Sequence, residues 1–486
     1  MSKTVNQYRY LIALLLGASA VIGYAPFYIY PAPIITLAGL FYLWQKANSP
    51  RQAMLIGYAY GLGLFGAGVS WIYVSLHVYG GMPAVLAGLA TAAYCAFLAL
   101  FPAAAGYVSA RFESFKPYAM PFAWVLFEWV LNWIFTGFPW MTIGNAQVPY
   151  SPLASLAPIA GVYGMALAAA IVAGLVAAWF RGSARRSILI ALAAIWINSS
   201  LLKHIEWSTP VGKPISVSLL QGNISQDLKW QEEEIQRTLA TYLDLARQHP
   251  AQLVVLPETA LPMLLDQVPD EYRQALINAG GGEVLAGIVE SESKHYYNSM
   301  ASFGGARAQV YRKDHLVPFG EFIPLKAALG WIYNDLLHIP LTDLSSGGTT
   351  QRPLDLAGQK VAVNICYEDV FGEEIIRQLP EATLLINASN DAWYGDSLAA
   401  HQHLQMSQVR ALETGRMMLR ATNTGATAFI SPHGEVIAEA PLFTTTALTG
   451  EAQGYSGTTP YVRFGNWPVI SLIFLALGVL WHRKKK

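Results

Sequence analysis

Three reactive side chains in the C-terminal half of this chain each follow an apolar, strand-like run. Glu258 follows LVVL, Lys313 follows AQVYR and Cys366 follows VAVNI. About fifty residues separate each from the next. If these strands end at one edge of a single parallel sheet, a carboxylate, an amine and a thiol meet there. We therefore expect one reaction centre built from all three.

This set of groups suits acyl transfer through a covalent intermediate. A free thiol, with a pKa of about 8.5, is mostly protonated at neutral pH and needs a base. A partly desolvated glutamate such as Glu258 can take that proton and later return it to a leaving group. A lysine ammonium such as Lys313 can stabilise an oxyanion in a dry site, an effect of about 3 to 4 kcal/mol for one donor. Cys366 would then be the nucleophile.

Taken one at a time, these residues have ordinary structural explanations. A glutamate after a proline is usually a turn residue, a lysine at a strand end is usually surface charge, and a cysteine in a strand is usually a small core residue. A disulfide explains Cys366 poorly, because the only other cysteine, Cys95, lies in a separate, membrane-grade apolar stretch. The combination favours catalysis.

The distribution of charge indicates two environments. The chain is 53% hydrophobic and has a formal net charge of +0. Residues 1–205 contain two acidic and ten basic residues, whereas residues 206–466 contain 29 acidic and 17 basic residues. The first region has the composition of a membrane domain, and the second that of a water-exposed domain.

Apolar runs long enough to cross a hydrocarbon core of about 30 Å predict eight transmembrane helices. They lie near residues 10–25, 27–45, 53–76, 84–108, 118–136, 157–180, 187–202 and 467–482. The first run has an alternative interpretation as a secretory signal, because Ala18-Ser19-Ala20 resembles a cleavage site, but we expect it to be retained. The predicted domains are therefore 1–205 with seven helices, 213–455 in water, and 467–482 as the eighth helix.

Basic residues in every second loop predict the orientation of these helices. The basic loops contain Lys3, Arg9, Lys46, Arg51, Arg111, Lys116, Arg181, Arg185, Arg186 and residues 483–486. The intervening loops, including 136–152, contain no Lys or Arg. Because positive charge marks cytoplasmic loops, we expect both termini in the cytoplasm and the acidic domain outside the inner membrane, in the periplasm of a diderm bacterium.

From about residue 213 the pattern changes to short strands separated by polar helices. The strand-like runs are ISVSLL, AQLVVL, GEVLAGIVE, SMASFG, AQVYR, VAVNIC, TLLINAS and ATAFIS. Residues 231–247 carry one apolar helical stripe, and residues 401–420 form a second candidate helix. This alternation predicts an α/β domain with reactive residues at strand ends. We expect no metal site, because His401 and His403 would diverge on a helix and the domain's lone cysteine cannot form a thiolate cluster. We also expect no cofactor.

Four motifs in this region resemble the nitrilase, or carbon-nitrogen hydrolase, superfamily. LPETALP, KDHLVPFGEF, NICYED and NASNDAWYG follow the order of its Glu-Lys-Cys motifs and cover most of residues 215–450. The helices and the segments EWVLNWIFTGFPW, SLLQGNISQDLKW and TPYVRFGNWP resemble its membrane-anchored branch, bacterial apolipoprotein N-acyltransferase. The resemblance implies an αββα sandwich beside a polytopic α-helical membrane domain.

The resemblance also implies a reaction. An acyl chain passes from a glycerophospholipid to the thiol of Cys366, and then to the α-amino group of the diacylglyceryl-cysteine at a lipoprotein's N-terminus. Glu258 corresponds to the general base and Lys313 to the oxyanion-stabilising residue. The implied partners are membrane phospholipid, the apolipoprotein and the bilayer, without nucleic acid. Further matches are two acidic residues that support the triad, Glu321 and Glu368, and three aromatics near the site, Tyr367, Trp230 and Trp393.

Three features of the apolar segments leave alternatives open. Where many relatives carry an arginine, this chain has Leu131 and Asn132, so a head-group contact through that arginine is in doubt. Glu128, the only acidic residue in an apolar run, is either a functional intramembrane carboxylate or a hydrogen-bond acceptor inside the bundle. The outer-domain stretches 263–265 and 325–341 could admit an acyl chain from the bilayer surface, or could be ordinary core.

Two other functions have to be weighed. A membrane-tethered nitrilase-type amidase would hydrolyse a C–N bond and resolve its thioester with water, but eight helices exceed the need of a tether. A transporter or a receptor would not need the Glu, Lys and Cys set, and the apolar runs offer almost no charged residues for a transport pathway. The acyltransferase is the interpretation that accounts for both regions.

Overall fold

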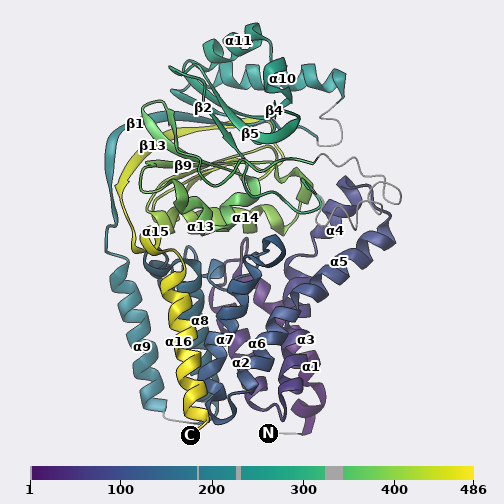
Figure 1. Ribbon diagram of the computed structural model, residues 1–486, viewed down its shortest axis with the longest axis vertical. Helices are drawn as coiled ribbons and strands as arrows, with labels where there is room; N and C mark the ends of the chain where they lie inside the picture. Colours follow the sequence, from purple (N-terminus) through teal and green to yellow (C-terminus); the bar gives the residue numbers. More distant parts are fainter. Residues whose placement is uncertain (1–2, 183–184, 226–230, 323–342) are drawn as a thin grey trace. The chain divides into compact units, whose positions relative to one another are not determined.

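The computed structural model describes residues 3–182, 185–225, 231–322 and 343–486, and its chain divides into two compact units (Figure 1). The first unit comprises residues 1–73, 83–206 and 463–486, and the second comprises residues 74–82 and 207–462. The predicted site residue Trp230 and the apolar stretch 325–341 lie outside the described residues.

The first unit is α-helical (Figure 1). Its main helices are α1 (Lys3–Ala20), α2 (Pro31–Gln45), α3 (Pro50–Gly68), α5 (Ala84–Leu98), α6 (Leu100–Ala110), α7 (Lys116–Leu131), α8 (Ala157–Phe180), α9 (Arg185–Leu202) and α16 (Trp467–Lys484). Helices thus occupy all eight predicted apolar runs. Among the described residues, the stretches 84–110, 152–180 and 185–202 are long and apolar enough to cross a membrane by length and composition, and α3 with residues 72–79 is a bent fourth candidate. The eight crossings remain a prediction.

The predicted run 53–76 is interrupted. The backbone leaves the helical region at Val69, where φ is −131°, and α3 ends at Gly68. The short α4 (Ile72–Val74) and a π-helical turn (Ser75–Tyr79) follow at an angle of 58° to α3. From residue 74 to residue 82 the chain belongs to the second unit. The predicted run 53–76 is therefore a bent pair of helices, which together are long and apolar enough for one broken span.

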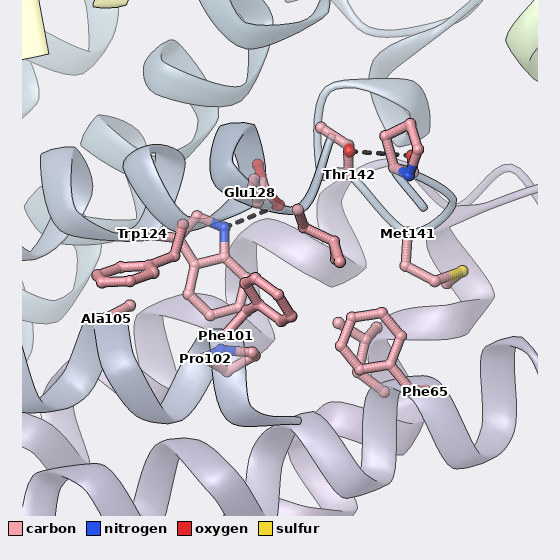
Figure 2. A pocket seen from close by; sticks show the side chains of 12 residues that line it. Phe65, Phe101, Pro102, Ala105, Trp124, Glu128, Met141 and Thr142 are labelled. Atoms are coloured by element: carbon pink, nitrogen blue, oxygen red, sulfur yellow. Dashed lines mark hydrogen bonds between the residues drawn. The ribbon is translucent and has the colours of Figure 1, made fainter. Parts of the chain in front are cut away.

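Glu128 lies near the C-terminal end of α7, inside the first unit (Figure 2). Its Oε1 accepts hydrogen bonds from the Trp124 indole N–H and from the Ile143 backbone N–H, both at 3.0 Å. Its Oε2 is buried and has no hydrogen-bond partner among the described residues. A cavity of about 20 Å³ lies beside it, with a mostly apolar wall that includes Phe65 and Phe101. The carboxylate therefore ties the loop after α7 to the helix.

Two β-sheets form the centre of the second unit (Figure 1). The seven-stranded sheet has the order β13-β1-β2-β4-β5-β6, with β3 paired to β4. The six-stranded sheet has the order β12-β11-β10-β9-β8-β7. The strands of the first sheet are β1 (Ser208–Gln221), β2 (Leu253–Val255), β3 (Leu261–Leu264), β4 (Glu283–Glu292), β5 (His295–Phe303), β6 (Val310–Arg312) and β13 (Thr446–Gly457). Those of the second are β7 (Leu354–Leu356), β8 (Gln359–Ile365), β9 (Leu384–Ser389), β10 (Met418–Thr422), β11 (Ala428–Ile430) and β12 (Val436–Glu439).

Helices cover the outer face of each sheet, which gives the αββα arrangement (Figure 1). On the first sheet, α10 (Glu232–Gln248) and α11 (Asp270–Gly280) bury apolar side chains such as Tyr242 and Leu276 against strand residues such as Val254. On the second, α13 (Gly372–Ile375) and α14 (Leu398–Thr414) contribute Ile375 and Leu404 to a separate core. The predicted α/β domain is confirmed.

One prediction about this unit was wrong, and a second had the wrong end point. Glu258 and Lys313 follow strands of the seven-stranded sheet, whereas Cys366 follows β8 of the other sheet, so the three do not share one sheet edge. The helix predicted over 401–420 ends at Thr414, because Gly415 adopts a left-handed backbone with φ of 63° and β10 begins at Met418. The three reactive residues therefore come from two sheets, and the charges of Glu258 and Lys313 act on the Cys366 thiol.

Candidate active site

The nucleophile candidate lies on a strained turn. Cys366 follows β8 directly, begins a 3₁₀-helix (Cys366–Val370) and has a φ of +52°. A non-glycine residue in this region costs about 1 to 3 kcal/mol and needs support from its surroundings. The Cys366 carbonyl accepts a hydrogen bond from the Asn387 side chain at 3.1 Å, and Nε2 of His403 lies 3.2 Å from it. These contacts hold the turn that presents the thiol.

The carboxylate and the amine candidates lie together. Nζ of Lys313, which follows β6, lies 3.5 Å from Oε1 of Glu258 and donates a hydrogen bond to Oε1 of Glu321 at 2.9 Å. Glu321 also accepts a hydrogen bond from the Val317 backbone N–H, at 2.8 Å. The lysine side chain is 1% exposed and the Glu258 side chain 9%. Two carboxylates therefore face one buried ammonium.

Asn298, which the sequence analysis did not single out, connects the two carboxylates. Its side-chain N–H group donates to Oε1 of Glu258 at 2.7 Å and to Oε1 of Glu321 at 3.0 Å. The backbone carbonyl of Asn298 accepts a hydrogen bond from the backbone N–H of Lys313 at 2.8 Å. Asn298 is buried in β5, where a polar side chain needs hydrogen-bond partners, but in the sequence a polar residue inside a strand resembles a solvent-facing one.

Two backbone features fix the position of Glu258. Its Oε2 accepts a hydrogen bond from the Asn390 backbone N–H at 2.8 Å. Behind it, β4 passes so closely that a Cβ atom on Gly287 would overlap the Pro257 carbonyl and lie 2.7 Å from the Glu258 Cα. With Asn298 and Lys313 on Oε1 and Asn390 on Oε2, both carboxylate oxygens have partners.

Burial keeps the thiol protonated, and the neighbouring carboxylates keep the amine charged. Burial raises the pKa of the Cys366 thiol well above its usual value, and the Glu258 carboxylate adds to this rise while Lys313 opposes it. Burial alone would lower the pKa of Lys313, but the nearby Glu321 and Glu258 carboxylates outweigh it and raise the pKa. The thiol therefore needs a base to react, and the ammonium is available to stabilise negative charge.

Glu368, a predicted supporting residue, ties the two reactive strand ends together. Its Oε2 accepts from the Ile365 backbone N–H at 2.6 Å, and its Oε1 accepts from the Asp314 backbone N–H at 2.7 Å. The Tyr311 hydroxyl donates to it at 3.0 Å. Burial raises the pKa of Glu368 to about 7, although these N–H groups oppose the rise. One side chain thus joins the residue before Cys366 to the residue after Lys313.

The predicted aromatic residues have different environments. Tyr367 is buried and packs edge-on against Phe371 and His315, with ring centroids 5.1 and 5.7 Å away. Trp393 is 42% exposed and lies in the turn after β9 (Asp391–Tyr394). In the predicted apolar stretch 263–265, Met263 and Leu265 are partly buried and pack against the core of the first sheet.

A fully buried cluster of charged side chains adjoins the backbone of Cys366 through His403. Arg420 donates to Asp369 at 3.0 Å and to Asp391 at 2.9 Å, and His403 lies 2.7 Å from Asp369 and 3.1 Å from Asp391. Burial and Arg420 lower the pKa of His403, but the two aspartates outweigh them and raise it. Among the described residues, no group of three or more His, Cys, Asp and Glu side chains could hold a metal ion.

Two family models match the chain. Residues 16–175 match the apolipoprotein N-acyltransferase N-terminal domain, and residues 216–461 match the carbon-nitrogen hydrolase domain. The second model covers the site residues from Glu258 to Trp393.

Individual relatives match almost the whole chain. A Nitrosomonas europaea protein named apolipoprotein N-acyltransferase is 50% identical over 97% of this chain and 96% of its own length. A Chromobacterium violaceum protein of the same name is 45% identical over 98% of this chain and 94% of its own length. Among solved structures, a carbon-nitrogen hydrolase from Helicobacter pylori aligns with 49% of this chain and 88% of its own length, at 18% identity and a TM-score of 0.37.

Proposed function

Because this chain belongs to the apolipoprotein N-acyltransferase family, we propose that it transfers an acyl chain through a thioester on Cys366 to a lipoprotein amine. Glu258 serves as the general base and Lys313 stabilises the oxyanion. The observation that carries this assignment is the pairing of a partnered Glu258 carboxylate with the buried Lys313 ammonium, in an environment that raises the pKa of the Cys366 thiol.

In the acylation step, Glu258 takes the proton of the Cys366 thiol as the sulfur attacks an ester carbonyl of a glycerophospholipid. The carbonyl oxygen becomes an oxyanion, which the Lys313 ammonium stabilises. When the C–O bond of the ester breaks, the lysophospholipid oxygen takes the proton back from Glu258. The products are a thioester and a lysophospholipid.

In the transfer step, the α-amino group of a diacylglyceryl-cysteine attacks the thioester carbonyl. Glu258 accepts a proton from this amine, the C–S bond breaks, and the sulfur leaves and regains a proton. The product is an amide at the lipoprotein N-terminus. Because one thiol serves both substrates in turn, the kinetics should be ping-pong, with parallel double-reciprocal lines.

The catalytic unit is proposed to lie on the periplasmic face of the inner membrane, held there by eight transmembrane helices with both termini in the cytoplasm. The basic residues in alternate loops and the helices at all eight apolar runs support this topology. Its substrates, a phospholipid and a diacylated lipoprotein, are both anchored in that membrane. Accessibility labelling of single cysteines placed in a basic and a non-basic loop of a Cys95→Ala, Cys366→Ala background tests the orientation.

Intact mass measurement after incubation with phospholipid alone tests the first half-reaction. We expect one acyl mass on the protein, located at Cys366 by peptide mapping and released by hydroxylamine. An acyl group on another residue, or none, would contradict the proposal. Adding a diacylated peptide should move the acyl group to its amine, whereas release of free fatty acid instead would indicate the alternative, a nitrilase-type hydrolase.

A further inference from the structure

A short segment between α3 and α5 has its contacts in the catalytic unit rather than among the helices that flank it in sequence. Residues 74–82 are assigned to the second unit. Within this segment the Gly80 N–H donates to the Ser75 carbonyl and the Met82 N–H to the Leu76 carbonyl, both at 2.9 Å. Nδ1 of His77 lies 2.8 Å from the Met82 carbonyl. The segment therefore closes on itself around its π-helical turn, an element that occurs often at functional sites.

This segment contacts the turn that carries Trp393. The Ser75 hydroxyl donates a hydrogen bond to the Trp393 backbone carbonyl at 2.7 Å. The rings of Tyr79 and Trp393 meet edge to face, with centroids 6.1 Å apart and planes at 70°. At the end of the turn, Gly395 has a φ of +57°, and a Cβ atom there would lie 3.0 Å from Cγ1 of Val74.

The other end of the same turn contacts the candidate general base. The Asn390 backbone N–H donates to Oε2 of Glu258, and Asp391 is held by Arg420 and Ser389 at 2.9 and 2.8 Å. Residues 390–395 therefore run from the Glu258 carboxylate to the 74–82 segment. Trp393, which contacts the 74–82 segment, is only three residues from Asn390. A shift of Trp393 would therefore move the Asn390 N–H group that orients Glu258.

We propose that residues 74–82 act as a brace that holds the 390–395 turn in its catalytic position, which makes Ser75 and Tyr79 positioning residues for acyl transfer. The brace rests on the proposed role of Glu258. The Asn390 N–H holds Oε2 while Asn298 holds Oε1, and together they fix the rotation of the carboxylate that is to accept the thiol proton. Because proton transfer depends steeply on donor–acceptor geometry, loosening the turn should slow acylation while leaving the affinity for substrate nearly unchanged.

The test uses the purified full-length protein with Ser75→Ala and Tyr79→Leu, and with Val78→Ala as a control, because Val78 lies in the same segment but is 54% exposed. Acyl-enzyme formation is followed with a short-chain soluble p-nitrophenyl ester and with phospholipid in nanodiscs. Hydrogen exchange of the 390–395 amides is measured on the same samples. Ser75→Thr, which keeps a hydroxyl, serves as the rescue variant.

We expect Ser75→Ala to slow acylation by both donors about tenfold, with half-saturating concentrations within about twofold of the parent. Exchange of the 390–395 amides should accelerate in that variant and in Tyr79→Leu, and Ser75→Thr should recover most of the rate. The control should match the parent in both measurements.

Two outcomes would overturn the brace: unchanged exchange at 390–395, or faster exchange with an unchanged acylation rate. The exchange measurement does not depend on which residue becomes acylated. If peptide mapping of the parent places the acyl group away from Cys366, the proposed function fails, whereas the contact between the two segments is still decided by exchange.

Discussion

Glu258 and Glu128 are two buried carboxylates in different units, and their partners differ. Both oxygens of Glu258 accept hydrogen bonds, and the buried Lys313 ammonium lies 3.5 Å from one of them. Glu128 accepts two N–H groups on one oxygen, and its other oxygen is buried without a hydrogen-bond partner among the described residues. The residue lines a mostly apolar cavity (Figure 2). The first arrangement suits proton transfer and the second suits a fixed structural link.

The difference shows that burial of a carboxylate does not by itself indicate chemistry. What distinguishes the Glu258 site is a cation and a thiol at the same place, with separate donors for each oxygen. At Glu128, the two donors connect α7 with the loop that follows it. The predictions below test this contrast, from the largest expected effect to the smallest.

Cys366→Ser should abolish acyl transfer, because a hydroxyl is a far weaker nucleophile than a thiol when the neighbouring base is a carboxylate. The measurement is acyl-enzyme mass together with N-acylated peptide formed. Cys95→Ala is the matched control and should retain full activity, since Cys95 lies in the other unit. Activity above a few per cent in the serine variant would remove Cys366 from its role.

Glu258→Gln should change two rates in opposite directions. Acylation should fall by about 10² to 10⁴, because an amide cannot accept the proton. Alkylation of Cys366 by iodoacetamide at pH 8 should become faster, because the Glu258 charge contributes to the raised pKa of the thiol and its removal lowers that pKa. A slower alkylation in this variant would show that Glu258 does not raise the thiol pKa.

The same pKa shift predicts how the parent enzyme responds to pH. Since the pKa of Cys366 is raised, only a small fraction of the thiol is ionised at neutral pH. Alkylation in the absence of lipid should therefore rise about tenfold per pH unit between pH 7 and 9, without a plateau. A plateau below pH 8 would mean that the thiolate is already formed at rest.

Lys313→Met should reduce the acylation rate about a hundredfold or more, because it removes a buried oxyanion donor. It also leaves Glu258 and Glu321 close together without their cation, so stability should be measured alongside. A double variant with Glu321→Gln relieves that repulsion and should regain stability. If the double variant also regains the acylation rate, Lys313 stabilises the folded protein and does not stabilise the oxyanion.

Glu128 variants should give the smallest catalytic effects. Glu128→Gln keeps an oxygen acceptor for Trp124 and Ile143, so turnover should stay within about threefold of the parent. Glu128→Ala leaves both donors unpaired and should cost about 1 to 3 kcal/mol per donor, visible as a lower unfolding temperature in detergent. A large loss of turnover in Glu128→Gln with unchanged stability would make Glu128 a functional carboxylate.

How much could be predicted from the sequence depended on whether a feature is local. Strand ends are local, so Glu258, Lys313 and Cys366 could be selected from the runs that precede them, and the α/β pattern and the apolar helices followed from periodicity. The family resemblance rested on motifs and is confirmed by matches over nearly the whole chain. The catalytic roles of Glu258, Lys313 and Cys366 remain predictions.

The arrangement of those elements could not be predicted, because it depends on contacts between distant segments. Nothing near VAVNI indicates that β8 belongs to a different sheet from β2 and β6. Asn298 lies inside a strand, where a polar residue looks like a solvent-facing position. The Asn390 N–H is a backbone group that every residue type but proline supplies, so no residue type marks it. The packing of residues 74–82 against Trp393 depends on where α3 breaks.

The close approach of β4 to the backbone of Glu258 limits which substitutions the site can accept. A side chain at Gly287 would push against Pro257 and displace the Cα of Glu258. In a saturation library selected for growth dependent on this enzyme, position 287 should therefore accept glycine alone, as strictly as position 366 accepts cysteine. The number of positions that tolerate no substitution would then exceed the number of residues that react, because Gly287 takes no part in the chemistry and only leaves space for the backbone of Glu258.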